Sequence, residues 1–266
     1  MKLTRRTVFA GFGAGLITAS IAPARVFAAG DTLNVVATTG MIADTAARVG
    51  GDLVKVRALM GPGVDPHAYR QTRTDIVAMA KADLVLWNGL FLEAQMEEVL
   101  HDISRRTKVT AVAEAVPEDL LIAHDDYADR FDPHVWMDPN LWRDVTAAVR
   151  DAMVAAAPQH ETEFVTNADT FLAEIDALAL YGGKVLGSVP ETARVLVTAH
   201  DAFNYFGRAY GFDVVGIQGI STESEAGLNR MTTLVDMLVD RDIHAVFVES
   251  SVSDRNIRAV IEGATA

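Results

Sequence analysis

Short apolar runs that alternate with helical patterns are the feature that most restricts how this chain can fold. In the first half, runs with strand character alternate with patterns of helical periodicity, at residues 33–38, 41–49, 54–60, 74–82, 83–87, 92–103 and 108–112. Strands separated by helices in this way indicate βαβ units and a parallel sheet.

The alternation stops between residues 141 and 189, where no strand pattern is present. Two helical stretches fill this region and are separated at Pro158, with a weak point at Gly182 and Gly183 near the end of the second. The second stretch, at about residues 159–186, would extend about 40 Å as one helix, which is longer than a small lobe requires. It suits a rod that connects two lobes.

After Pro190 the alternation resumes, with strands and helices predicted at 193–198, 203–210, 213–217, 228–239, 245–248 and 254–263. The sequence therefore predicts an α/β protein with two parallel-sheet lobes joined by a single long helix. We place the N-terminal lobe at residues 29–157, the linker helix at 158–189 and the C-terminal lobe at 190–266. The second lobe has three predicted strands against four in the first, so it looks truncated.

Residues 1–28 have the pattern of a signal peptide: a basic start, an apolar stretch at 8–22 and small residues before the end. Arg5 and Arg6 resemble a twin-arginine export signal, so we expect a periplasmic protein. The chain has no cysteine, which excludes disulfides, thiolate metal sites and a lipidated cysteine. Its net charge of −13 argues against nucleic acid as a partner.

Three of the seven histidines stand out by context. His67 and His134 each end an Asp-Pro-His motif in a predicted loop, and His200 follows a predicted strand. Ligands of open α/β sheets bind outside the carboxyl ends of strands, and neutral imidazole is the commonest metal ligand. We therefore predict a metal site at these three histidines, in which Asp65 and Asp132 orient imidazoles.

The other histidines lack this context. We expect His101 on a helix and His160 in solvent, and His124 in a surface loop, where it is at most a minor metal recruiter. The segment at residues 221–225 is expected to be a solvated, helix-capping loop.

Five motifs stand in order along the chain: Gly-Pro-Gly-Val-Asp-Pro-His at 61–67, Asp-Pro-His-Val-Trp-Met-Asp-Pro at 132–139, His-Asp-Ala-Phe-Asn-Tyr-Phe at 200–206, Gly-Ile-Gln-Gly-Ile-Ser-Thr-Glu at 216–223 and Val-Phe-Val-Glu-Ser-Ser at 246–251. Together they resemble the TroA-like metal-binding solute-binding proteins of ABC importers. The resemblance implies a metal ion in an interlobe cleft, with His67, His134 and His200 as ligands. It also implies a monomer that works with an ABC permease and its ATPase subunit, and no catalysis.

The sequence departs from this family in ways that bear on the metal. The family's fourth ligand is an aspartate after a further strand, so we expect the natural chain to continue past Ala266 by roughly 30–50 residues. The His-rich loop of zinc-specific members is short here, at residues 122–131. Three imidazoles nevertheless favour zinc. We interpret the cargo as Mn²⁺ or Zn²⁺, leaning to manganese in the cell and tighter zinc binding in vitro.

Two alternatives stay open on the sequence alone. A periplasmic zinc hydrolase would need a general base near the metal, and Glu249 is the one candidate, although it fits better as a carboxylate that orients a ligand. A metal-binding adhesin is the other.

Overall fold

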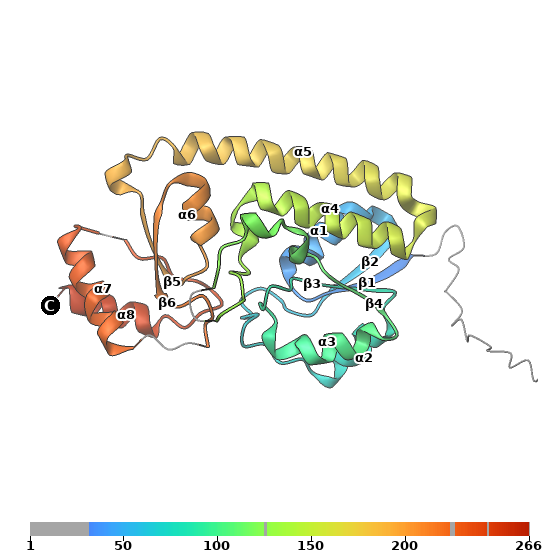
Figure 1. Ribbon diagram of the computed structural model, residues 1–266, viewed down its shortest axis with the longest axis horizontal. Helices are drawn as coiled ribbons and strands as arrows, with labels where there is room; N and C mark the ends of the chain where they lie inside the picture. Colours follow the sequence, from blue (N-terminus) through green and yellow to red (C-terminus); the bar gives the residue numbers. More distant parts are fainter. Residues whose placement is uncertain (1–31, 125–126, 224–226, 244, 266) are drawn as a thin grey trace, which may run out of the picture.

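The computed structural model describes residues 32–124, 127–223, 227–243 and 245–265, so the predicted signal peptide at 1–28 lies outside the described residues. Two parallel sheets form two lobes, and one long helix runs along the side of both (Figure 1). The predicted α/β architecture of two lobes and a connecting helix is confirmed. Within the part of the chain that is described, we find no helix long and apolar enough to cross a membrane.

The first lobe contains a parallel sheet in the order β2-β1-β3-β4. Its strands are β1 (Leu33–Ala37), β2 (Val54–Ala58), β3 (Leu84–Trp87) and β4 (Lys108–Ala111), within one or two residues of the predicted bounds. Helices α1 (Gly40–Gly50) and α4 (Pro139–Ala156) cover one face, whereas α2 (Arg73–Lys81) and α3 (Glu97–Ser104) cover the other (Figure 1).

Side chains of β1 alternate between the two faces of this sheet. Leu33 and Val35 belong to the core under α1 and α4, while Val36 packs on the opposite face with Met79 and Leu100 of the other helix pair. This alternation follows from the two-residue period of a strand. Because both faces are buried, β1 and β3 are almost continuously apolar.

The long helix is α5 (Glu161–Leu186), a single unit of 26 residues that packs on α4 and α1 and reaches α6 of the second lobe. At 1.5 Å per residue it spans about 39 Å. The helix continues through Gly182 and Gly183, so the weak point expected there is not a break. A Cβ at Gly182 would lie 2.7 Å from the Tyr210 hydroxyl, which explains the glycine as a site of close packing.

The second lobe is built on a two-stranded parallel sheet of β5 (Val195–His200) and β6 (Asp213–Gln218). Its helices are α6 (Asn204–Tyr210), α7 (Leu228–Asp240) and α8 (Arg255–Thr265). The third strand predicted at 245–248 is wrong as a regular strand, because the described residues there pair with β5 only through a bridge between Thr198 and Phe247. Phe247 and Val248 are 51% and 67% exposed, so this apolar run gains little from burial. The continuation past Ala266 stays a prediction.

Candidate metal centre

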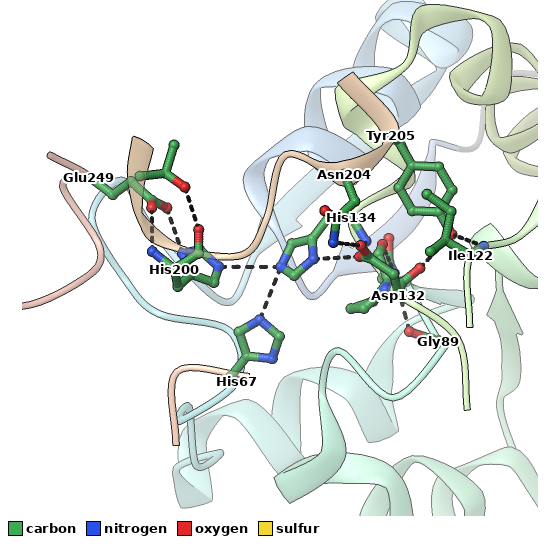
Figure 2. Close-up of polar contacts among 12 residues, drawn as sticks. His67, Gly89, Ile122, Asp132, His134, His200, Asn204, Tyr205 and Glu249 are labelled. Carbon is green, nitrogen blue, oxygen red and sulfur yellow. Dashed lines mark hydrogen bonds and ion pairs between the residues drawn. The ribbon is translucent and has the colours of Figure 1, made fainter. Parts of the chain in front are cut away.

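The three predicted histidines come from distant segments and meet between the lobes. His67 lies in the loop between β2 and α2, His134 directly precedes a short 3-10 turn, and His200 is the last residue of β5. The Nε2 atom of His134 lies 3.1 Å from Nε2 of His67 and 3.3 Å from Nε2 of His200 (Figure 2). All three side chains are buried, and their Nε2 atoms face one another.

No other group of this kind is found among the residues that the structure describes. The ligand atoms of His67, His134 and His200 lie within 4.8 Å of one another, a spacing in which one ion can contact all three. Three neutral nitrogen donors without sulfur suit zinc and the neighbouring divalent transition metals.

Asp132 fixes the orientation of His134. Its Oδ1 accepts a hydrogen bond from the backbone N–H of His134 at 2.9 Å and lies 2.6 Å from Nδ1 of the same residue. Burial alone would raise the pKa of Asp132, but the attraction and hydrogen bonds of His134 hold the pKa below its usual value. An ionised carboxylate only accepts, so Nδ1 carries the proton and the lone pair of Nε2 points to the other histidines.

Glu249 also contacts His200 at two atoms, but only the contact with the backbone N–H is a hydrogen bond. Its Oε1 accepts from the backbone N–H of His200 at 3.0 Å, and its Oε2 lies 2.8 Å from Nδ1. Both oxygens therefore face His200 (Figure 2). This arrangement favours the orienting role over that of a general base, which needs a free oxygen near the substrate.

His67 is supported differently, and one expectation for it is wrong. Asp65 does not orient the imidazole: its Oδ1 accepts from the backbone N–H of His67 at 2.9 Å, and its Oδ2 accepts from the Thr222 hydroxyl at 2.6 Å. The pKa of His67 is held well below its usual value, chiefly by burial and then by the nearby imidazoles of His134, His200 and His124. A neutral His67 is the form that binds a cation.

A buried carboxylate beneath the site has no counterpart in the sequence-based predictions. Glu93 is fully buried and accepts from the Thr38 hydroxyl at 2.6 Å and from the backbone N–H groups of Asn88 and Gly89. Asn88 in turn donates to the carbonyl of Pro133, the residue before His134. Burial raises the pKa of Glu93 to about 7, in spite of these hydrogen bonds. The sequence could have pointed to this buried carboxylate, because Glu93 is the one acidic residue in the largely apolar run at 84–96.

The second lobe also contributes residues that the sequence analysis did not single out. Asn204 donates to Oδ2 of Asp132 at 3.1 Å, and the Tyr205 hydroxyl donates to the carbonyl of the same residue at 2.8 Å. These contacts join α6 to the loop of His134. Both residues lie in the motif at 200–206, which carried the family resemblance but gave neither of them a role.

His101, His124 and His160 lie away from this cluster or at its margin, and His244 lies outside the described residues. His101 lies on α3, as predicted, where it is exposed and forms a T-shaped ring contact with Trp87. His160 is buried against Phe164, so the expectation of a solvated side chain is wrong. His124 is buried beside Tyr127 and acts electrostatically on His67, so it is not a simple surface residue.

The cluster opens on one side to a cavity of about 520 Å³. Met60, Trp136 and Ser250 are among the residues that line it, together with the three histidines. An ion held by the imidazoles would therefore face a space large enough for water or a further ligand.

Comparison with known proteins identifies relatives of the whole architecture. Residues 35–266 match the family model of ZnuA, described as the periplasmic component A of a zinc-uptake complex. The chain belongs to the ZnuA family. This ZnuA-family chain is 47% identical over 232 residues to the manganese-binding lipoprotein MntA of Bacillus subtilis, which covers 87% of this chain and 76% of that protein. The resemblance to TroA-like solute-binding proteins is thereby confirmed.

Two further relatives extend the comparison of this ZnuA-family protein. It is 40% identical to the zinc-binding protein TroA of Treponema pallidum over 232 residues, 87% of this chain and 75% of that protein. The structure of TroA superposes with a TM-score of 0.85 over 88% of this chain and 84% of that chain. The iron-binding protein YfeA of Yersinia pestis is 30% identical over 249 residues, 94% of this chain and 79% of that protein.

Proposed function

We propose that this ZnuA-family protein captures one divalent transition-metal ion between its lobes and delivers it to an ABC importer. The observation that carries this proposal is the convergence of three buried Nε2 atoms, from His67, His134 and His200. Asp132 and Glu249 aim two of these nitrogens before any metal arrives, which lowers the cost of ordering the site. Capture without catalysis accords with the names of the relatives, a metal-binding lipoprotein and an uptake component.

The proposed ligands divide between the lobes. His67 and His134 belong to the N-terminal lobe, proposed at residues 29–157, whereas His200 belongs to the C-terminal lobe, proposed at 190–266, beyond the linker at 158–189. An ion bound to all three histidines would hold the lobes together. Metal binding should therefore stabilise the closed arrangement, and opening would release the ion to a permease.

Manganese is our proposed cargo, with zinc binding more tightly in vitro. The 47% identity to a manganese-binding lipoprotein supports manganese, while the relatives named for zinc and iron show that close relatives differ in their metal. Three imidazoles favour zinc over manganese by ligand type and by the order of intrinsic affinities. Availability in the cell, as well as affinity, then selects the cargo.

The proposal places the protein outside the cytoplasm, as a monomer whose partners are an ABC permease and its ATPase subunit. The pattern at residues 1–28 and the periplasmic assignment of the family model support export. Arg5 and Arg6 make the twin-arginine route the proposed one.

Calorimetric titration of the metal-free protein with Zn²⁺ and with Mn²⁺ tests this function. We expect one ion per chain, tighter binding of zinc, and loss of binding when two of the three histidines are replaced together. Metal analysis of protein recovered from its native cells then identifies the cargo. Absence of stoichiometric binding of either ion would overturn the proposal.

A further inference from the structure

Each Asp-Pro-His motif makes a hydrogen bond to the second lobe through its aspartate. Asp132 accepts from Asn204 at 3.1 Å, and Asp65 accepts from the Thr222 hydroxyl at 2.6 Å. In both motifs the other carboxylate oxygen accepts the backbone N–H of the histidine two residues later. The same local turn therefore links a histidine of the first lobe to a side chain of the second.

The two links differ in what else supports the histidine. Asp132 also contacts the imidazole of His134, and the Tyr205 hydroxyl bonds its carbonyl, so His134 is held by several contacts. Asp65, in contrast, contacts His67 only by accepting its backbone N–H, and its second oxygen accepts from the Thr222 hydroxyl. Loss of the Thr222 hydroxyl would leave Asp65 free to turn away from the backbone of His67.

Residues beside Thr222 strengthen this link between the lobes. Gln95 of the first lobe donates to both carboxylate oxygens of Glu223, at 3.2 and 3.0 Å. These contacts are exposed and individually weak, whereas the bond between Thr222 and Asp65 is short and partly buried. Both contacts have a carboxylate as acceptor, so the shorter distance and the partial burial distinguish the bond between Thr222 and Asp65. Thr222 is therefore the residue of this segment best placed to act on the site.

We propose that Thr222 is a positioning residue for His67, which acts through Asp65 and slows release of the bound metal. The inference rests on the proposed function, since it treats His67 as a ligand. When the lobes are closed, the Thr222 hydroxyl fixes Asp65, and Asp65 fixes the backbone from which His67 reaches the ion. Opening the lobes breaks the bond between Thr222 and Asp65, and His67 is then the ligand that is freed first.

Stopped-flow kinetics on the full chain test this role, with Co²⁺ as the metal and a chelator to follow release. Thr222→Val removes the hydroxyl and keeps the shape, and we expect release about tenfold faster with association within about twofold, since residues behind a ligand affect affinity by roughly 10–100-fold. Thr222→Ser retains a hydroxyl and should release at the wild-type rate. The Co²⁺ absorption spectrum of Thr222→Val should shift, which a general loss of stability would not cause.

Thr170→Val is the matched control, because that exposed hydroxyl bonds the Thr166 carbonyl within α5, away from the cleft. Thr222→Ala repeats the test without a branched side chain. Wild-type release and an unchanged spectrum in both Thr222→Val and Thr222→Ala would overturn the inference while leaving the proposed function intact. Equal acceleration in Thr222→Ser and Thr222→Val would overturn it as well. Failure of the wild type to bind Co²⁺ or Zn²⁺ would instead overturn the proposed function, and the inference with it.

Discussion

Glu249 contacts His200 at two atoms: one carboxylate oxygen accepts the backbone N–H at 3.0 Å and the other lies 2.8 Å from Nδ1. The two residues are 49 positions apart in the chain. Asp132 makes the corresponding two contacts with His134, only two residues away, and there both are hydrogen bonds, whereas Glu249 meets Nδ1 of His200 as an ion pair. Two of the three imidazoles are thus held by a carboxylate on the side opposite the proposed metal.

Removal of a single imidazole should weaken metal binding. His67→Ala, His134→Ala and His200→Ala are each expected to reduce affinity at least about tenfold, since even residues behind the ligands contribute about 10–100-fold. Competition titration of Zn²⁺ against a chelating dye measures the change. His101→Ala is the control on an exposed helix and should bind as the wild type does. Because His160 is buried, His160→Ala should lower the melting temperature and leave affinity unchanged. Equal loss of affinity in all five variants would contradict the site assignment.

Neutralising the orienting carboxylates should also weaken binding. Glu249→Gln keeps the shape of the side chain but removes the charge beside Nδ1 of His200, which should lower affinity by about tenfold. Glu262→Gln is a matched control, since Glu262 is exposed on α8. Calorimetry on metal-free protein measures both. Identical affinities in the two variants would show that Glu249 does not support the ligand.

Acidification should release the metal. Ligating imidazoles must be neutral and an ordinary histidine titrates near pH 6.5, so affinity should fall steeply below about pH 6. The lowered pKa of His67 keeps this residue neutral further into the acid range, because burial and the neighbouring imidazoles disfavour its protonation. Binding measured between about pH 7.5 and pH 5 tests this. An affinity that is flat over the range would show that carboxylates, not these histidines, hold the ion.

Glu93 should make the metal-free protein less stable as the pH rises. Its pKa is raised from 4.5 to about 7 in the folded state, so the unfolded state loses its proton first. The contribution of Glu93 to the free energy of unfolding should therefore be largest below pH 4.5. It should fall as the pH rises and be lost above about pH 7. The loss is on the order of 3 kcal/mol at most.

Urea unfolding of wild type and Glu93→Gln at several pH values isolates this contribution. The glutamine does not titrate, so the difference in unfolding free energy between the two proteins should change with pH between about 4.5 and 7. Both proteins keep His67, whose lowered pKa acts in the opposite direction, and its effect cancels in the difference. A constant difference across the range would show that Glu93 is ionised throughout.

The two adjacent glycines of α5 should respond differently to alanine. A Cβ at Gly183 meets no atom within 4 Å, so Gly183→Ala should stabilise the helix by about 0.5–1 kcal/mol. A Cβ at Gly182 would lie 2.7 Å from the Tyr210 hydroxyl, and displacing that ring should cancel or exceed the same gain. Thermal unfolding measures the contrast. Equal melting temperatures would mean that Tyr210 does not pack against this turn of α5.

Much of the architecture follows from local pattern. The apolar runs at 33–38 and 83–87 became the central strands β1 and β3, because a strand buried on both faces leaves an almost continuous apolar signal. Helix α5 was visible as a long stretch of helical periodicity without a strand. The run at 245–248 shows the limit of such signals, since a strand also needs a partner along its whole length, and Phe247 forms only one bridge.

The sequence also singled out the three histidines that cluster in the structure, because proline-stiffened loops and strand ends have a local signature. The residues that hold them were decided by tertiary structure. Asp132 lies two residues from His134 and was predicted to orient an imidazole. Glu249 was also expected to orient a ligand, but its partner His200, 49 residues away, was not predicted. The bond between Thr222 and Asp65, 157 residues apart, was not predicted at all. Hydrogen bonds depend on atoms meeting within about 3 Å, and for distant segments only the packing of two lobes sets that distance.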